Sequence, residues 1–216
     1  MMNALVLMFA PVLLIFEPIP TWERIWKGRP GPLLIFILYL LPLLALTSLA
    51  EGYRLSHSGR EGQLATQPLP PLSIREAIVY ETGQALLFLV IILFGAKVIK
   101  AIGETFHGRH TYQQAFITVA YGLSPWLLFR FLDFFPAISP WVSWGVGIML
   151  SIAVLYQGVP RIMEPDPPNA FGLYLMSSLL LFLVTGLVRF MTVWFLQGRF
   201  VKLEAMLSGL AARLPF

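Results

Sequence analysis

The chain has 216 residues, of which 57% are hydrophobic and only 12% are charged, with a formal net charge of +4. Soluble domains carry about 25% charged residues, so this composition excludes an ordinary soluble globule. The sequence has no cysteine, which excludes a disulfide framework, a thiolate metal site and cysteine catalysis. We therefore expect an all-α integral membrane protein covered by lipid, in which each span needs about 20 apolar residues.

Residues 1–31 are predicted to form an interfacial N-terminal segment. The apolar stretch up to Phe16 has no basic start and no small-residue cleavage site, so we do not expect a secretory signal peptide. This stretch either lies in the membrane interface or is half-buried there. Trp22 and Trp26 follow at helical spacing beside Lys27, a combination typical of the headgroup level.

Residues 32–197 are predicted to form a domain of five transmembrane helices. The expected spans are residues 32–50, 77–96 with a helical extension to about 106, 112–134, 140–157 and 170–196. Capping boxes are expected to begin at Ser73 and Thr111, and Ser139 is expected to cap the fourth span. Pro42 is expected to kink the first span. The polar stretch from Glu51 to Leu72 is expected to be an irregular loop, and we favour a solvated linker over a lid or docking loop.

The third span contains the motif Tyr121-Gly122-Leu123-Ser124-Pro125, which predicts a bend. Pro125 removes one backbone hydrogen bond and its ring clashes with the carbonyl of Tyr121. Gly122 and Ser124 leave room for another backbone to approach. Tyr121, Ser124 and Pro125 are therefore candidates for lining a cavity at the bend, although packing is the commoner role of such a bend.

The fourth span carries small residues at a spacing of four, namely Ser143, Gly147 and Ser151. Such a face allows membrane helices to pack closely. Gly158 followed by Pro160 is a usual stop signal, so we expect this helix to end at Gln157.

The fifth span, capped by Asn169, places Ser178, Thr185 and Thr192 at a spacing of seven, and Arg189 joins their face. This polar stripe is expected to point into the bundle. Residues 198–216 are predicted to form an amphipathic C-terminal helix, because apolar residues from Phe200 onward recur on one side.

Four ionisable residues are candidates for a site at membrane depth. Arg130 and Asp133 lie three apart, and we favour an intrahelical pair at the interface over a functional role. Arg189 either reaches the surface or forms a buried pair with Asp133 or Glu81, since a lone charge in hydrocarbon costs several kcal/mol. Our hypothesis is a polar cluster of Glu81, Asp133 and Arg189 in the outer half of the bundle.

Other chemistry finds little support in the sequence. His107 and His110 are interpreted as part of a solvated turn, since a metal site needs three or four ligands. No nucleophile elbow, phosphate-binding glycine loop or pair of acids at a plausible depth is recognised, so we expect neither an enzyme nor a bound cofactor. No aromatic and basic pattern suggests nucleic acid as a partner. With the N-terminus inside, the inner segments carry slightly more Lys and Arg than the outer ones.

Three short motifs resemble the Yip family of multi-span membrane proteins, which are named for interacting with Ypt/Rab GTPases. These motifs are Phe16-Glu17-Pro18, then Tyr121-Gly122-Leu123-Ser124-Pro125-Trp126, and Leu155-Tyr156-Gln157-Gly158-Val159-Pro160. The resemblance implies five spans, a cytoplasmic N-terminus and a C-terminus on the far side. In eukaryotic members it also implies roles in vesicle traffic, Rab binding and membrane shaping.

The sequence departs from those eukaryotic members because it has no long polar N-terminal region. It looks more like the bacterial and archaeal branch, which implies a cell (inner) membrane location and gives no reason to expect Rab binding. Our first functional interpretation is a membrane-organising or accessory subunit that binds lipids, other membrane proteins or a second copy of itself. The alternative is a small oligomeric transporter or channel that uses the polar cluster.

Overall fold

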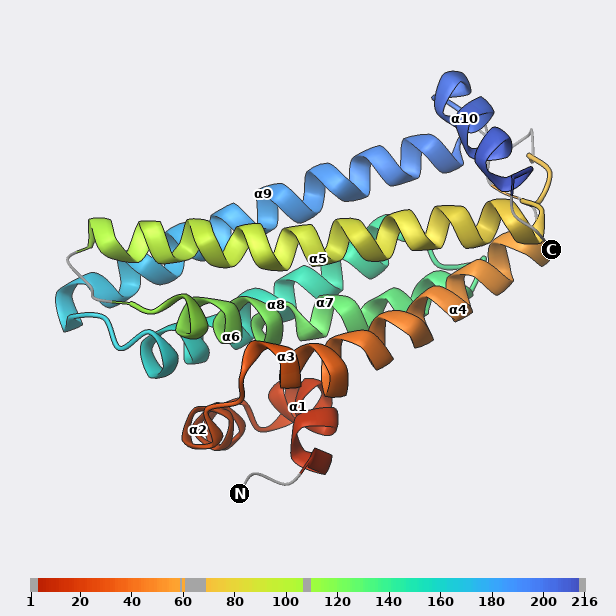
Figure 1. Ribbon diagram of the computed structural model, residues 1–216. Coiled ribbons are helices and arrows are strands. Elements are labelled where there is room, and N and C mark those ends of the chain that lie inside the picture. The colour runs from red at the N-terminus through yellow and green to blue at the C-terminus, as the bar shows by residue number, and fades with distance from the viewer. Residues whose placement is uncertain (1–3, 59, 61–68, 107–109, 214–216) are drawn as a thin grey trace.

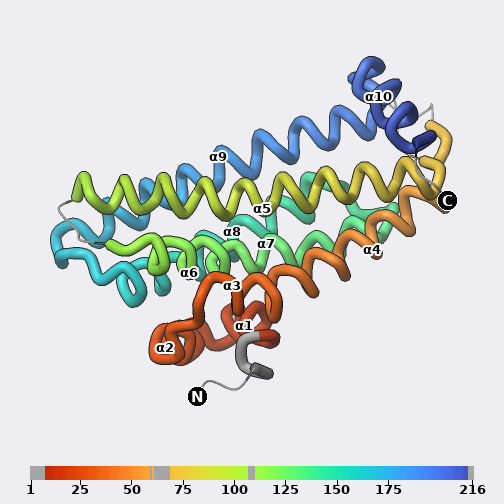
Figure 2. The backbone as a smooth tube through the Cα atoms, viewed as in Figure 1, coloured from red at the N-terminus to blue at the C-terminus, as the bar shows by residue number. Residues whose placement is uncertain are grey.

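The computed structural model describes residues 4–58, 60, 69–106 and 110–213, and the elements there are helices apart from one antiparallel bridge between Arg60 and Leu69 (Figure 1). Five helical stretches are long and apolar enough to cross a membrane: Pro32–His57, Ile74–Thr105, Tyr112–Phe134, Pro140–Ile162 and Pro167–Leu196. The predicted all-α fold with five spans is therefore confirmed. The spans run side by side along one axis, from left to right in Figure 2.

The first span consists of α3 (Pro32–Ile35), the π-helical turn η1 (Phe36–Leu40) and α4 (Leu41–His57). The wider η1 turn ends two residues before Pro42, whose nitrogen cannot donate a backbone hydrogen bond. The predicted irregularity at Pro42 thus takes the form of a π turn. The expected helix end at Ala50 is wrong, because α4 continues to His57 and the polar connection is shorter than the sequence suggested.

Burial on one face explains why α4 continues past Ala50. Thr47, Glu51 and Leu55 lie four residues apart, and all three side chains are buried against the neighbouring helices. Residues at this spacing share one face of an α-helix. Tertiary packing therefore keeps the polar-looking end of α4 helical, as it does for most helices in proteins.

The second span, α5 (Ile74–Thr105), is the longest described helix and begins at the predicted capping box. The Ser73 hydroxyl accepts a hydrogen bond from the Glu76 amide at 3.3 Å, and the Glu76 carboxylate accepts one from the Ser73 amide at 2.9 Å. At about 1.5 Å per residue, its 32 residues extend about 48 Å, so the helix projects beyond about 30 Å of hydrocarbon.

The third span is broken where the sequence predicted a bend. It consists of α6 (Tyr112–Gly122), α7 (Ser124–Phe129) and the 3₁₀ turn η2 (Arg130–Phe134), with the interruption at Leu123. Pro125 has no N–H for the Tyr121 carbonyl, and the Ser124 hydroxyl donates to that carbonyl instead, at 2.5 Å. The predicted irregularity between Tyr121 and Pro125 is confirmed.

The fourth span, α8 (Pro140–Ile162), begins at the predicted Ser139 cap but does not end at Gln157. Pro160 lies inside the last turn, where it removes a single backbone hydrogen bond. Trp22 packs against the second half of α8, where its indole N–H donates to the Val154 carbonyl at 3.1 Å. The helix continues to Ile162, so the predicted end at Gln157 was wrong.

The fifth span, α9 (Ala170–Leu196), follows the 3₁₀ turn η3 (Pro167–Asn169). Asn169 does not cap it as predicted, because the side-chain amide of Asn169 donates to the Phe106 carbonyl at 3.1 Å. The predicted polar stripe does face the bundle, since Ser178, Thr185 and Thr192 are all buried.

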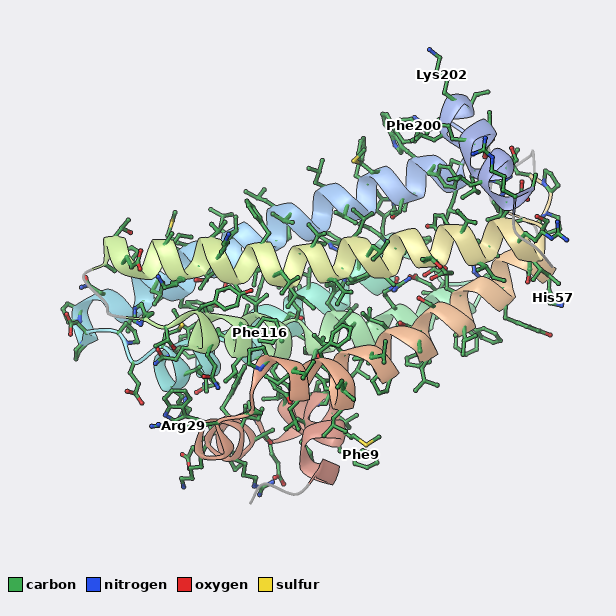
Figure 3. The ribbon with its side chains drawn as sticks, in the orientation of Figure 1. Phe9, Arg29, His57, Phe116, Phe200 and Lys202 are labelled. Atoms are coloured by element: carbon green, nitrogen blue, oxygen red, sulfur yellow. The ribbon has the colours of Figure 1, made fainter. Side chains whose placement is uncertain are left out.

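Three shorter helices complete the described fold: α1 (Ala4–Phe16), α2 (Pro18–Gly28) and α10 (Val201–Ala211). Helix α1 contacts α2 and α7, and it buries Ala10 and Leu14 completely. Helix α2 lies across the bundle, whereas α10 packs on α5 (Figure 1). Figure 3 shows Arg29 after α2 and Lys202 in α10 toward opposite ends of the bundle. The two termini are thus separated along the bundle axis.

Charged residues bracket the spans at two levels. The helix axis between Glu81 and Lys97 is about 24 Å long. The corresponding charge-free lengths are about 28 Å from Pro32 to Glu51, 27 Å from Tyr112 to Arg130, 31 Å from Pro140 to Arg161 and 28 Å from Ala170 to Arg189. These lengths agree with about 30 Å of hydrocarbon. Glu51, Glu81, Arg130 and Arg189 therefore lie near one boundary of the apolar layer.

Candidate functional site

Two groups of buried ion pairs lie at this boundary, where α4, α5, η2, α8 and α9 meet. We call them together the charged layer. Its members are Glu51, Glu81, Arg130, Asp133, Ser143 and Arg189. Ionisable groups at membrane depth are expensive to bury and are candidates for function for that reason.

Arg130 connects three spans. One of its guanidinium nitrogens, Nη2, donates to Glu51 Oε2 at 2.7 Å and to Glu81 Oε2 at 3.3 Å. The three side chains are 5%, 2% and 6% exposed, so the pairs are almost fully removed from solvent. The guanidinium also lies 4.6 Å from the centre of the Phe88 ring, in a cation–π contact. One guanidinium is thus shared by two carboxyl groups from different spans.

Arg189 forms the second group, with η2 and the start of α8. Its Nη2 atom donates to Asp133 Oδ1 at 2.6 Å and to the Pro140 carbonyl at 2.7 Å. The Ser143 hydroxyl accepts from the same Nη2 atom at 2.9 Å and donates to Asp133 Oδ1 at 2.5 Å. Hydrogen bonds of this charged type are roughly twice as strong as neutral ones. This group fixes the end of α9 to the turn between the third and fourth spans.

The predicted cluster of Glu81, Asp133 and Arg189 is thus divided between two groups in the structure. Arg189 pairs with Asp133, which was one of its two expected partners, whereas Glu81 pairs with Arg130. Arg130 and Asp133 do not form the intrahelical pair that we favoured, because each finds a partner on another helix. The reason lies in Glu51: with two carboxylates on α4 and α5, Arg130 is drawn to them and Asp133 is left for Arg189.

Glu51 is the member of the charged layer that the sequence reasoning missed. It follows Ala50, where the first span was expected to end, and so it was assigned to the polar loop. Its spacing of four from both Thr47 and Leu55 was the available signal, because that spacing predicts one shared helix face. The burial of all three residues shows that this face points into the bundle.

The small-residue face of α8 contacts the broken third span. A Cβ atom added at Gly147 would lie 2.9 Å from the Trp126 Cα. The backbone of α7 therefore packs directly against this glycine. The Ser151 hydroxyl accepts a hydrogen bond from the Trp126 amide at 3.1 Å. Ser151 therefore satisfies an amide at the start of α7 that the helix cannot satisfy itself. In the same face, Ser143 belongs to the charged layer.

Tyr121 and Pro125 pack in the core at the break. The Tyr121 ring is fully buried and stacks on the Tyr39 ring, with 4.7 Å between centroids. The Tyr39 hydroxyl donates to the Ala120 carbonyl at 2.9 Å, so the π turn η1 supplies a partner to the end of α6. The two irregular points of the bundle therefore meet, and η1 donates a hydrogen bond to the third span there.

Gly158 leaves the space into which Trp22 of α2 packs. A Cβ atom at this glycine would lie 2.5 Å from the Trp22 ring, which is itself fully buried. Pro160 follows in the same last turn of α8. Gly158 and Pro160 therefore belong to the part of α8 against which α2 packs, far from the charged layer.

A groove of about 830 Å³ lies between α4 and α5. Most of its lining is apolar and includes Leu49, Tyr53 and Ile78, whose side chains are exposed on the outer surface of the bundle. Ser48 and Glu81 also line it. Among the residues that the structure describes, neither the Ser48 hydroxyl nor Glu81 Oε1 has a hydrogen-bond partner. The groove therefore joins the charged layer to the lateral surface, and we call it the α4–α5 groove.

The solvated position expected for His110 is wrong, because His110 is buried and packs against Gly103, whereas His107 lies outside the described residues. No group of three or more His, Cys, Asp or Glu with the geometry of a metal site occurs within the described ranges.

The comparison with protein families gives one match. The family model of the Yip1 domain matches residues 12–208, which covers the five spans and most of the flanking helices. No curated protein and no solved structure matches the chain.

Proposed function

Since the chain belongs to the Yip1 domain family, we propose that it acts as a membrane-organising or accessory subunit that binds lipids or other membrane proteins through its lateral surface. The α4–α5 groove carries this proposal. It opens among exposed apolar side chains that face the bilayer, and it leads to a buried carboxylate. Ligand sites combine a largely apolar cleft with a few polar groups in this way.

The alternative is a small oligomeric transporter or channel, and the buried charges favour it. The packing below the charged layer favours lateral binding instead. Arg130 lies on the Phe88 ring, and that ring packs on Trp126 with 4.6 Å between centroids. Farther along, the stacked rings of Tyr39 and Tyr121 occupy the core. Aromatic side chains thus fill the path that a solute would take between the helices.

Within this proposal, residues 32–197 carry the binding surface, and residues 1–31 and 198–216 attach the bundle to the two membrane faces. We further propose that the N-terminus faces the cytoplasm and the C-terminus faces outward in a bacterial or archaeal cell membrane. The segments on the N-terminal side carry slightly more Lys and Arg than those on the other side, which favours this orientation. The position of α2 and α10 at opposite ends of the bundle is compatible with it.

Photo-crosslinking in native membranes tests the proposal. A photoreactive amino acid is placed singly at Leu49, Tyr53 or Ile78 in the groove, and at Leu183 or Leu187 as controls, since those two are exposed on α9. We expect a defined lipid class or one membrane protein to be captured at the groove positions in excess over the controls.

The same capture profile at all five positions would contradict lateral binding at the groove. The transporter alternative is tested in parallel with the purified protein in liposomes. Movement of an ion or solute that Glu81→Gln abolishes would replace the proposed function with transport.

A further inference from the structure

The α4–α5 groove contains a strong hydrogen-bond acceptor that the described protein atoms leave unused. Glu81 Oε2 is held by Arg130, whereas Glu81 Oε1 has no partner within the described chain, although the residue is only 6% exposed. Leaving such an atom unsatisfied costs about 1–3 kcal/mol, and more for a charged group. Glu81 Oε1 therefore has room for a further hydrogen-bond donor, which either the neighbouring Ser48 hydroxyl or a ligand that enters the groove can supply.

Ser48 adds a second polar group on the opposite wall. Its hydroxyl is also without a partner among the described residues, and it lines the same groove from α4. A hydroxyl donates one hydrogen bond and accepts others, whereas an ionised carboxylate only accepts. The pair therefore fits a ligand that offers one O–H donor to Glu81 and one oxygen acceptor to Ser48.

The depth of Glu81 restricts the kind of ligand. Glu81 lies at the boundary of the apolar layer, about 24 Å along α5 from Lys97 at the other boundary. In a bilayer, this is the level at which acyl chains join their polar groups. From Glu81 to Leu89 the groove continues for about 12 Å along α5 toward the membrane centre, close to the roughly 15 Å of one leaflet.

The groove is apolar along most of its length, and its polar groups lie at and beyond Glu81. On the headgroup side of Glu81, Ser56 and His57 line it together with the apolar residues Ile74, Ala77 and Ile78. Ala45, Ala85 and Leu89 line it below Glu81, on the hydrocarbon side. Its volume of about 830 Å³ falls within the roughly 300–1,000 Å³ of small-molecule sites. This distribution matches an amphiphile that lies parallel to its neighbours in the same leaflet.

We propose that the α4–α5 groove binds an acylated glycerol that retains a free hydroxyl group. The glycerol hydroxyl donates to Glu81 Oε1, the ester carbonyl accepts from the Ser48 hydroxyl, and the acyl chain lies along Ala85 and Leu89. Diacylglycerols and lysophospholipids share this chemistry, whereas diacyl phospholipids such as phosphatidylcholine have no free hydroxyl on the glycerol. The inference rests on the proposed function, because it names the lipid class that the lateral surface selects.

The test measures lipid retention by the full-length purified protein, using native mass spectrometry in mixed micelles. A diacylglycerol and a lysophosphatidylcholine are added in separate arms, each against a diacyl phosphatidylcholine with the same acyl chain. We expect at least tenfold preferential retention of one or both of the hydroxyl-bearing lipids. The arm that shows it identifies the source of the hydroxyl.

Two variants and one control assign that preference to the groove. Glu81→Gln removes the charged acceptor and is expected to reduce the preference about tenfold, a difference of about 1.4 kcal/mol. Ala85→Trp fills the apolar part without changing a charge and is expected to abolish retention. Glu104→Gln makes the same charge change in an exposed part of α5 at the other boundary, and it is expected to have no effect.

Equal retention of all three lipids overturns the inference, as does a preference that neither groove variant changes. If Glu81→Gln fails to fold, Ala85→Trp still decides the question. The two proposals can fail separately. If crosslinking at Leu49 or Tyr53 captures one membrane protein but the purified protein shows no lipid preference, the organising role is supported and the acylglycerol site is rejected.

Discussion

At the scale of single residues, Arg130 has the largest structural role. It is the shared cation of two carboxylates from different spans, and all three side chains are buried. A buried ion pair contributes little net stability by itself, because its desolvation offsets its attraction. Removing one partner is different, since the remaining charges then lie unpaired in a layer that water scarcely reaches.

Arg130→Met is therefore expected to destabilise the bundle by about 3–5 kcal/mol. Thermal unfolding in a mild detergent, followed by the loss of monodisperse protein, measures this effect. Arg75→Met is the matched control, because Arg75 is exposed near the start of α5 at the same end of the bundle. If both variants unfold at the same temperature, Arg130 does not hold the charged layer together.

Arg189 and Asp133 allow a reciprocal test by charge exchange. Arg189→Glu alone places a carboxylate beside Asp133, and we expect a loss of about 3–5 kcal/mol. Asp133→Arg in the same chain restores opposite charges and is expected to recover about 0.5–3 kcal/mol of it. Recovery stays partial, because a glutamate at position 189 cannot donate to the Pro140 carbonyl as Arg189 does. A double variant no more stable than Arg189→Glu, measured by the same unfolding assay, would contradict the pair.

At the scale of elements, local signals predicted most helix starts and failed at several ends. Ser73, Thr111 and Ser139 cap their helices as the sequence indicated, because a cap is a contact between residues near in sequence. The ends of α4 and α8 depend on contacts with other helices, which the sequence does not display. Pro160 illustrates the limit, since α8 continues past the predicted stop to Ile162 and α2 packs against it.

Gly158 and Gly145 give opposite expectations for one substitution in one helix. A Cβ at Gly158 would overlap the Trp22 ring, whereas a Cβ at Gly145 meets no atom within 4 Å. Gly158→Ala is therefore expected to cost about 1–3 kcal/mol through overpacking. Gly145→Ala is expected to stabilise α8 by about 0.5–1 kcal/mol through reduced backbone freedom in the unfolded chain.

Thermal unfolding of the two glycine variants measures these differences. The contact between α2 and α8 is not structurally important if Gly158→Ala unfolds at the same temperature as Gly145→Ala.

At the scale of the whole molecule, the sequence predicted the number of spans but only part of the candidate site. Hydropathy and length predict spans reliably, because a lipid-exposed backbone must satisfy its own hydrogen bonds. Which charges pair is decided by the rotation and depth of five helices relative to one another. The Arg189–Asp133 pair was among the expected alternatives, whereas the role of Glu51 required the fold.

The orientation of the chain is testable because it contains no cysteine. Single substitutions Lys27→Cys and Lys202→Cys place one thiol in the last turn of α2 and one in α10. These two helices lie toward opposite ends of the bundle (Figure 1). With the N-terminus in the cytoplasm, a membrane-impermeant maleimide is expected to label only Lys202→Cys in intact cells and both variants after permeabilisation. Labelling of Lys27→Cys alone in intact cells would reverse the orientation.

The order in which the charged layer forms has a consequence for biosynthesis. Glu51 and Glu81 leave the ribosome before Arg130, so the first group is complete once the third span has been made. Asp133 has no arginine partner until Arg189 is synthesised, 56 residues later. At roughly 5–20 residues per second, this delay is about 3–11 s. A nascent chain that stops before the fifth span exposes an unpaired carboxylate at the membrane boundary, a feature by which quality control can distinguish it from a finished protein.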